Sequence, residues 1–369
     1  MKLTKRRRLW CKVMDKGQKD RVRGQKYKKI LIVRMDKIGD LVLSTPAIKA
    51  VRDTYPDSYI AVLVRPYARE IIEGNPYINE VITYDKTNGD KGLLKNIRFI
   101  LNLRKKKFDL ALVLHPKNRT HIFLFLAGIP ARIGYDKKLG VLLTKKIPHI
   151  KQYGLKHEID YTLDLLRYIG VEPKEKALYV PVNKASEKKI GGIFAENGIS
   201  EDDMVITIHP GSSCPSKRWR AEHFAKVADS LAQNYKAKIV IIAGPGDKDF
   251  GDKTAELMKS KKTNLSCKTT IADLASILKR TRLFISNDSG PVHIACAVGA
   301  PTIAIFGRND RGLSPTRWRP VGEHDIALHK DIGCETCLSH NCALGFACLE
   351  AITEEEVLQA AEKILGRPV

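Results

Sequence analysis

The sequence predicts a two-domain α/β protein in which each domain is a doubly wound parallel sheet covered by helices. Short apolar runs alternate with helical patterns along most of the chain, and this β–α–β order favours a parallel sheet with both faces covered. The alternation restarts at Met204, after a stretch rich in Pro and Lys. At 369 residues the chain is also long for a single hydrophobic core. We therefore expect two domains of similar size, joined by a linker at 171–187, with a deep cleft between them.

The first predicted domain covers residues 30–170. Its strands are expected at Ile30–Val33, Tyr59–Val64, Glu80–Thr83 and Asp109–Leu114. Its helices are expected at Leu41–Tyr55, Tyr67–Glu73, Leu93–Arg104 and His157–Ile169. Gly170 follows the last of these helices, where a glycine commonly ends a helix.

The second predicted domain covers residues 188–350 and is followed by a C-terminal helical segment, 351–369. Strands are expected at Val205–Ile208, Lys238–Ala243, Leu283–Ser286 and Thr302–Phe306. Helices are expected at Ala221–Asn234, Asp252–Lys259, Ile271–Arg280, Pro291–Val298 and Glu354–Leu365.

The composition is that of a globular protein, with 43% hydrophobic and 28% charged residues. No apolar run reaches the roughly 18–20 residues that span a bilayer, and the basic N-terminus lacks the apolar core of a secretory signal. We expect a cytoplasmic protein. Its eight cysteines are then expected as thiols or metal ligands rather than disulfides.

The net charge of +23 is large, and residues 1–29 hold 13 Lys/Arg and two Asp, almost half of the excess. This N-terminal arm is either a solvated tail or a segment attracted to a polyanion, such as anionic lipid, lipopolysaccharide phosphate or nucleic acid. No nucleic-acid-binding motif accompanies the charge.

The stretch ILIVRMDKIGDLVLSTPAIKAVR predicts a strand, a loop and a helix, the place where doubly wound sheets bind ligands. The loop lacks G-x-G-x-x-G and is therefore not a dinucleotide fingerprint. Gly39 instead precedes a carboxylate, Asp40, at the start of the helix. Asp40 is either a general base or the N-cap of that helix.

Three loops of the second domain offer phosphate-binding chemistry. In HPGSS and the following KRW, two hydroxyls (Ser212 and Ser213) and Lys217 precede a helix start. In SNDSGPVH, Ser289 and the backbone at Gly290 could bind phosphate, with Asp288 holding the loop. Asp247, in the loop GPGDKD, could accept hydrogen bonds from a ribose. For the HPGSS loop the alternative is an ordinary strand–helix loop with exposed polar residues, and for Asp247 it is a solvated turn. His293, one turn into the helix after SNDSG, is either a base or a packing histidine.

Four cations near strand ends of the first domain suit an acceptor that carries phosphate or carboxylate: Arg65, Arg69, Lys117 and Arg119. Surface solvation is the alternative for each. Near the C-terminus, Cys334, Cys337, Cys342 and Cys348 fall within fifteen residues. Their spacing predicts a small structural zinc or iron site, with four reduced thiols as the alternative.

Five segments in this order, within the predicted strand–loop–helix contexts, resemble the family 9 glycosyltransferases, which include ADP-heptose:lipopolysaccharide heptosyltransferases. They are ILIVRMDKIGDLVLSTPAIKAVR, LVRPYAREIIEGNPYINEVI, HPKNRTH with LAGIPARIGY, HPGSS with KRW, and SNDSGPVHIACAVGAPTIAIFG. The resemblance implies the glycosyltransferase-B fold, two facing Rossmann-like domains. It also implies inverting transfer from ADP-heptose without a catalytic metal. It maps the base onto Asp40 and the diphosphate contacts onto Ser212, Ser213, Lys217, Asp288, Ser289 and Gly290. Gly39, Asp247 and His293 complete the predicted nucleotide-sugar site.

The predicted function is therefore transfer of heptose to a lipopolysaccharide inner-core acceptor, Kdo-lipid A or heptosyl-Kdo-lipid A. No cofactor is expected for catalysis, in which Asp40 acts as base and Lys217 offsets charge on the leaving ADP. The basic surface predicts a peripheral position on the inner face of the cytoplasmic membrane. The alternatives are the same fold with another nucleotide sugar or a protein acceptor and, from a different class, a basic nucleic-acid-binding protein.

Overall fold

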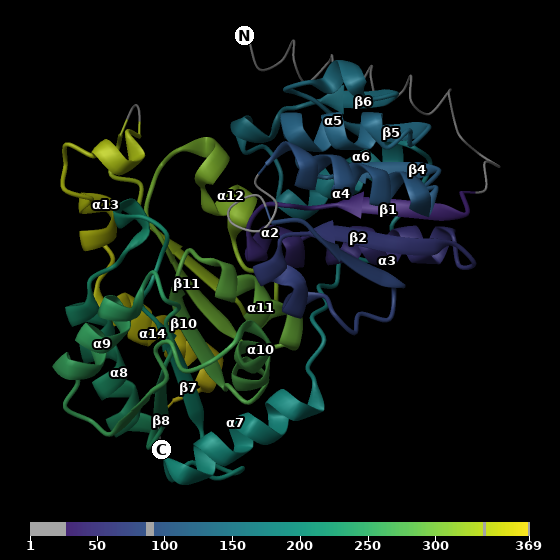
Figure 1. Ribbon diagram of the computed structural model, residues 1–369. Coiled ribbons are helices and arrows are strands. Elements are labelled where there is room, and N and C mark those ends of the chain that lie inside the picture. Colours follow the sequence, from purple (N-terminus) through teal and green to yellow (C-terminus); the bar gives the residue numbers. More distant parts are fainter. Residues whose placement is uncertain (1–26, 86–91, 335–336, 368–369) are drawn as a thin grey trace. The chain divides into compact units, whose positions relative to one another are not determined.

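The computed structural model describes residues 27–85, 92–334 and 337–367, and the chain forms two compact units (Figure 1). Unit 1 comprises Met1–Lys151 and Glu158–Tyr179, and unit 2 comprises Gln152–His157 and Val180–Val369. Among the described residues, no helix combines the length and the apolar character needed to cross a membrane.

Unit 1 is built on six parallel strands in the order β3-β2-β1-β4-β5-β6. The strands are β1 (Lys29–Val33), β2 (Tyr59–Val64), β3 (Glu80–Thr83), β4 (Leu110–Val113), β5 (Ala131–Asp136) and β6 (Lys145–Pro148). In the central strand β1, Ile30 pairs with Ile60 on one side and Leu110 on the other. Every residue of β1 after Lys29 is buried, as expected for a parallel strand covered on both faces.

The helices of unit 1 are α2 (Ile38–Val42), α3 (Thr45–Thr54), α4 (Leu93–Lys106), α5 (Asn118–Leu126) and α6 (Glu158–Tyr168). Short 3₁₀ helices are η1 (Pro66–Ile71), η2 (Gly140–Leu142) and η3 (Lys151–Tyr153), the last at the boundary between the units.

The predicted continuous helix Leu41–Tyr55 is wrong, because it is broken between Val42 and Thr45. Pro46 has no N–H to bond the Val42 carbonyl. The Thr45 hydroxyl donates to that carbonyl instead, at 2.7 Å. The helix predicted at Tyr67–Glu73 is a 3₁₀ helix, η1.

Unit 2 repeats the same topology with strands β7 (Val205–His209), β8 (Lys238–Ile241), β9 (Lys262–Asn264), β10 (Leu283–Asn287), β11 (Thr302–Phe306) and β12 (Ile326–His329). All are parallel, in the order β12-β11-β10-β7-β8-β9. Counted from the first strand of each unit, both sheets have the order 3-2-1-4-5-6 of Rossmann-type sheets. The predicted α/β class with parallel sheets is therefore confirmed.

The helices of unit 2 are α7 (Lys184–Glu196), α8 (Ala221–Tyr235), α9 (Lys248–Leu257), α10 (Ile271–Lys279), α11 (Gly290–Val298), α12 (Pro315–Trp318), α13 (Ala347–Glu350) and α14 (Glu354–Leu365). The 3₁₀ helices are η4 (Pro215–Lys217), η5 (Arg311–Leu313) and η6 (Ser339–Asn341). Helix α7 starts inside the segment expected as a linker, because Asn183 caps it by accepting from the Ser186 N–H at 2.7 Å. Helix α14 starts at a Thr353–Glu356 capping box and packs against α8.

Candidate functional site

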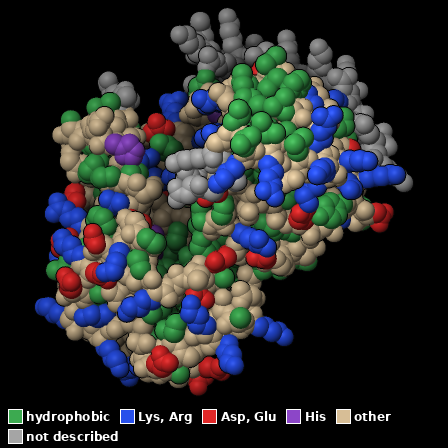
Figure 2. Space-filling model, viewed as in Figure 1, with side chains coloured by type: hydrophobic (Ala, Val, Ile, Leu, Met, Phe, Trp, Pro, Cys, Tyr) green, Lys and Arg blue, Asp and Glu red, His purple; other side chains and the backbone are tan. Residues whose placement is uncertain are grey.

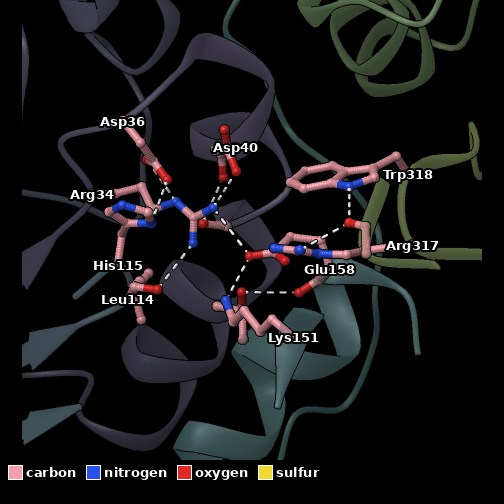
Figure 3. A network of polar contacts seen from close by, with 12 residues as sticks. Arg34, Asp36, Asp40, Leu114, His115, Lys151, Glu158, Arg317 and Trp318 are labelled. Atoms are coloured by element: carbon pink, nitrogen blue, oxygen red, sulfur yellow. Dashed lines mark hydrogen bonds and ion pairs between the residues drawn. The ribbon is translucent and has the colours of Figure 1, made fainter. Parts of the chain in front are cut away.

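The carboxyl end of β1 leads into a buried cluster of charged side chains in unit 1 (Figure 3). Arg34 follows the last residue of β1, and its side chain is only 1% exposed. Its guanidinium contacts Asp36 at 2.9 Å, Asp40 at 2.6 Å and Glu158 at 3.1 Å. It also donates to the Leu114 carbonyl, at 3.2 Å. Burial opposes the charge of Arg34, but attraction to the three carboxylates outweighs it and raises the pKa of the guanidinium.

Lys151 supplies the second cation of this cluster. Its ammonium lies 2.6 Å from the Glu158 carboxylate and 4.4 Å from the ring centre of Tyr135. Both Lys151 and Glu158 are buried. The cluster thus contains two cations, Arg34 and Lys151, and the three carboxylates that Arg34 contacts. The charges of the cluster balance when one of these carboxylates is protonated.

Asp36 is the carboxylate that the surroundings favour for that proton. Burial raises the pKa of Asp36 to about 7, although Arg34 opposes the rise. Its neighbour His115, which follows β4, lies 3.2 Å away. Burial, helped by the charges of Arg34 and Lys117, lowers the pKa of His115 to about 3, so this imidazole is neutral at physiological pH.

Asp40 lies in the first turn of α2, and the N-cap position belongs to Lys37. The alternative that Asp40 is the N-cap is therefore wrong. Its carboxylate pairs with Arg34 and stays 15% exposed, whereas Glu158 is buried. Among the carboxylates that Arg34 contacts, Asp40 is the most accessible. The preceding residue, Gly39, is buried in the same turn.

The four predicted acceptor-binding cations differ in their surroundings. Arg65 stacks on Tyr67, 4.7 Å from its ring centre, and the Tyr67 hydroxyl donates to the Asp36 backbone carbonyl at 2.6 Å. Arg65 therefore lies beside the charged cluster. Arg69 pairs with Glu73 on the exposed surface of η1, as the solvated alternative expects.

The remaining two cations lie at the start of α5, Lys117 just before it and Arg119 in its first turn. Lys117 is its exposed N-cap residue and lies near enough to His115 to affect its titration. Arg119 donates to the Tyr84 hydroxyl at 3.1 Å.

In unit 2, the predicted phosphate-binding loop follows β7 and is held by Asp247. The Asp247 carboxylate accepts from the Ser212 N–H at 3.2 Å and pairs with Arg218 at 3.3 Å. A Cβ atom on Gly211 would lie 2.5 Å from the Cβ of Asp247, so only glycine fits this position. Arg218 also donates to the Ser212 carbonyl and stacks on Phe250. The Asp247 carboxylate therefore holds the backbone of this loop at Ser212 and the side chain of Arg218.

Lys217 forms an ion pair with Asp288, which follows β10. The Ser212 hydroxyl donates to the backbone carbonyl of Asp288 at 3.3 Å. The structure thus joins the loops after β7 and β10, which are adjacent strands. Ser213, in the loop after β7, is exposed.

Ser289 is the N-cap residue of α11, with Gly290 as the first helical residue. The Ser289 hydroxyl lies 3.2 Å from Nδ1 of His209 and 3.0 Å from the Ser286 hydroxyl. Burial lowers the pKa of His209 to about 4, with Asp247 opposing the shift. His293 is buried within α11, in agreement with the alternative of a packing histidine.

Sequence reasoning did not single out Arg34, Glu158, Lys151 and Arg218, nor Arg308 in unit 2. Arg308 is buried and donates to the Ser216 hydroxyl at 2.7 Å and the Cys214 sulfur at 2.6 Å, beneath the phosphate-binding loop. A charged residue just after a buried strand was the available signal for Arg34 and Arg308. Glu158 and Lys151 are distant from Arg34 in sequence and carry no comparable signal.

The four clustered cysteines are free thiols. Burial, followed by the nearby Cys337, Cys342 and Cys348, raises the pKa of the Cys334 thiol. No group of three or more His, Cys, Asp or Glu side chains within 27–85, 92–334 and 337–367 is arranged to hold a metal ion. In this structure the four thiols are therefore not gathered into a metal-ligand set.

This chain is similar to heptosyltransferases and to a family 9 glycosyltransferase over about nine-tenths of its length. Lipopolysaccharide heptosyltransferase 3 of Escherichia coli is 28% identical, with 89% of this chain and 95% of the relative covered. The solved structure of a family 9 glycosyl transferase from Veillonella parvula has a TM-score of 0.84 at 27% identity, covering 92% of this chain and 97% of that one. The structure of E. coli ADP-heptose lps heptosyltransferase II has a TM-score of 0.73 at 21% identity, with 91% and 98% covered. The fold is thus of the glycosyltransferase-B type.

The family model described as glycosyltransferase family 9 (heptosyltransferase) matches residues 96–347, more than half of the chain. That range contains the loops after β4, β7 and β10, which carry His115, Lys217 and Asp288. The chain therefore belongs to glycosyltransferase family 9 and is a glycosyltransferase.

Proposed function

We propose that this enzyme transfers heptose from ADP-heptose to a lipopolysaccharide inner-core acceptor, with inversion at the anomeric carbon and Asp40 as general base. The observation that carries the proposal is the pairing of an accessible Asp40 with a buried Arg34 at the carboxyl end of β1. The names of the E. coli relatives support the donor and the acceptor, since they specify ADP-heptose and lipopolysaccharide.

Unit 1 provides the proton acceptor in this mechanism. Asp40 takes the proton of the acceptor hydroxyl as its oxygen attacks the anomeric carbon of the heptose. Arg34 is a positioning residue, since its guanidinium holds Asp40 and is itself held by Asp36 and Glu158. A base held in one orientation in this way loses little freedom on reaching the transition state.

Unit 2 provides charge stabilisation for the leaving group. As the new C–O bond forms, the bond between the anomeric carbon and the diphosphate breaks, and ADP takes the electron pair. Lys217 and the N–H groups at the start of α11 offset the developing negative charge. Asp288 orients Lys217 through their ion pair. This division of labour needs no metal ion in the chemical step.

Recognition of the acceptor belongs, in this proposal, to Arg65, Lys117 and Arg119. Arg65 adjoins Asp36 through Tyr67, and Lys117 adjoins His115. Guanidinium and ammonium groups match the phosphate and Kdo carboxylate groups of a lipopolysaccharide core. Arg69 is left out, because Glu73 engages it.

Mass spectrometry of a reaction containing ADP-heptose and heptose-free Kdo-lipid A tests the proposal. We expect one added heptose, and Asp40→Asn should lower turnover by the roughly 10²–10⁴-fold typical of a lost general base. Asp53→Asn is the matched control, because Asp53 pairs with Lys49 on the exposed face of α3. Near-normal turnover in Asp40→Asn would refute the base assignment. Activity only with another nucleotide sugar, or only on a protein, would refute the donor or the acceptor.

The four cysteines support a separate, structural proposal: a zinc or iron ion that draws them together. Its support is their spacing and the closeness of three thiols to Cys334. Anaerobically purified protein should then contain about one metal ion per chain, lost in Cys334→Ser with Cys337→Ser. Metal-free protein in which all four thiols react freely would refute it.

A further inference from the structure

Helix α4 presents a row of apolar side chains to the solvent. Leu94, Ile97 and Leu101 are 82%, 43% and 49% exposed, and Leu93 beside them is 76% exposed. Positions 94, 97 and 101 follow the spacing that places residues on one face of a helix. The opposite side of α4 is anchored by the buried Leu103. The helix is therefore amphipathic, but its outward face is partly apolar.

Helix α5 and the 3₁₀ helix η2 extend this apolar surface. On α5, Ile122, Phe125 and Leu126 are 37%, 49% and 50% exposed and share one face, while Val141 in η2 is 79% exposed. Helix α4 packs against α5, and α5 packs against η2. Figure 2 shows hydrophobic side chains gathered over the region of α5, with Lys and Arg side chains around them. We call this surface the α4–α5 patch; its members are Leu93, Leu94, Ile97, Leu101, Ile122, Phe125, Leu126 and Val141.

The charge around the α4–α5 patch is strongly one-sided. Residues 92–146 contain 13 Lys/Arg and only two acidic residues, Asp109 and Asp136. Both acidic residues are engaged, Asp109 by backbone N–H groups at Lys28 and Lys29 and Asp136 by Lys146. Helices α4 and α5 contain no acidic residue at all. Arg98 and Lys105 are exposed on the same helix as the apolar row.

Together with residues 1–29, this segment accounts for nearly all of the net positive charge of the protein. The two stretches hold 26 Lys/Arg and four Asp, leaving 38 Lys/Arg and 37 Asp/Glu in the other 285 residues. The apolar surface therefore lies in one of the two places where cationic charge is concentrated. A surface that binds another protein does not need apolar side chains surrounded by cations. An anionic lipid surface, in contrast, attracts both the apolar row and the cations around it.

We propose that the α4–α5 patch is the surface by which this enzyme docks onto an anionic lipid bilayer, with its apolar side chains among the acyl chains and Arg98 and Lys105 at the headgroups. The inference deepens the proposed function, because an acceptor anchored by acyl chains is presented at such a surface. The patch belongs to unit 1, the unit that carries Asp40.

Co-sedimentation of the full-length protein with vesicles tests the proposal without any substrate. Vesicles of phosphatidylglycerol mixed with phosphatidylcholine should bind the parent protein, and phosphatidylcholine alone should bind it at least about tenfold more weakly. Leu94→Glu combined with Phe125→Glu should reduce binding to the anionic vesicles by at least about tenfold. Arg98→Glu with Lys105→Glu should reduce it similarly and flatten its dependence on salt.

Matched variants on unit 2 test whether any exposed apolar residues or cations would give the same effect. Leu257→Glu with Val321→Glu alters apolar residues that are 43% and 41% exposed, and Lys188→Glu with Lys261→Glu alters exposed cations. Both pairs should bind vesicles nearly as the parent does. Transfer to a deacylated, water-soluble acceptor should be unchanged in the patch variants, which shows that they are folded.

Three outcomes would overturn the proposal. Patch variants that sediment with vesicles like the parent would assign any binding to other residues, such as the N-terminal arm. Equal binding to neutral and anionic vesicles would contradict the role of Arg98 and Lys105. Patch variants that dissociate a dimer in sedimentation velocity, without losing vesicle binding, would make the surface an interface between copies of this chain. Failure of heptose transfer in the parent would refute the proposed function but leave these binding results interpretable.

Discussion

Asp36 gives the buried cluster of unit 1 a dependence on pH. Burial raises its pKa from 3.8 to about 7, so the folded protein holds a proton that the unfolded chain releases. The stability that this proton contributes is complete below about pH 4 and is lost as the pH rises through about 7. In Asp36→Asn this contribution is absent at every pH.

We therefore expect the free energy of unfolding of the parent to fall more steeply between about pH 4 and about pH 7 than that of Asp36→Asn. Urea unfolding at several pH values measures the difference. Asp53→Asn, which alters an exposed ion pair, should leave the slope unchanged. Parallel curves for the parent and Asp36→Asn would show that Asp36 is ionised throughout.

Lys217 has the role most easily separated from that of Asp40. Lys217→Ala removes the cation from the phosphate-binding loop and leaves Asp288 without its partner. ADP affinity and the rate of transfer should fall together, since both depend on stabilisation of the diphosphate. Calorimetric titration with ADP measures the first and initial rates the second. Lys188→Ala serves as the control for an exposed lysine. Wild-type ADP affinity in Lys217→Ala would show that Lys217 does not bind the diphosphate.

At the scale of elements, the loop after β7 depends on a glycine. Gly211→Ala would force its Cβ atom against the Asp247 side chain, 2.5 Å away, and displace the carboxylate that holds Ser212 and Arg218. We expect weaker ADP binding and a lower melting temperature.

Gly191→Ala is the matched control for that substitution. Gly191 lies within α7 with open space around its position, so the added methyl group should stabilise the helix by roughly 0.5–1 kcal/mol. Differential scanning calorimetry should thus show shifts of opposite sign for the two variants. A stabilised Gly211→Ala that binds ADP normally would contradict the close contact with Asp247.

The sequence predicted the interior strands well because they are apolar on both faces: Tyr59–Val64 and Thr302–Phe306 have the predicted bounds. The edge strand Glu80–Thr83 was also predicted with the bounds that the structure shows, although it is only partly buried. Strands β6, β9 and β12 were missed: they lie at sheet edges, span three or four residues and include polar or half-buried positions. Strand β5 was missed because alternating Arg132, Gly134 and Asp136 interrupt its apolar character.

The same physics explains which site residues could be found. Four predicted site residues come shortly after the carboxyl ends of buried strands, and the sequence pattern therefore places them where ligands bind: Asp40, Ser212, Lys217 and Asp288. The contact between Arg34 and Glu158 joins residues 124 positions apart. Neither local spacing nor composition encodes such a pairing, which only tertiary folding creates.

At the scale of the whole molecule, the two units use equivalent positions of the same topology. In unit 1 the charged cluster follows β1 and β4, and in unit 2 the phosphate-binding loops follow β7 and β10. These are the first and fourth strands of each sheet, where the strand order reverses and ligands bind.

Ligand binding should therefore stabilise particular regions of the molecule. ADP at about 100 times its Kd should add roughly 2.7 kcal/mol to the stability of the fold that binds it. Hydrogen exchange should slow at residues 209–218 and 286–293, and far less at residues 34–40. Protection confined to 34–40 would place the nucleotide in unit 1 and contradict the assignment of the loops.

Trp219 gives the nucleotide site an optical signal of its own. Its indole is fully buried, stacks on His223 and donates to the Ile352 carbonyl at 3.0 Å, while its backbone N–H is held by Asn287 beside the phosphate-binding loops. An indole so enclosed emits at short wavelength, and any shift of the surrounding loops alters its quenching by the imidazole. Because it adjoins the phosphate-binding loops, its fluorescence should change when ADP is added. That change should disappear in Trp219→Phe, so occupancy can be followed without a labelled nucleotide.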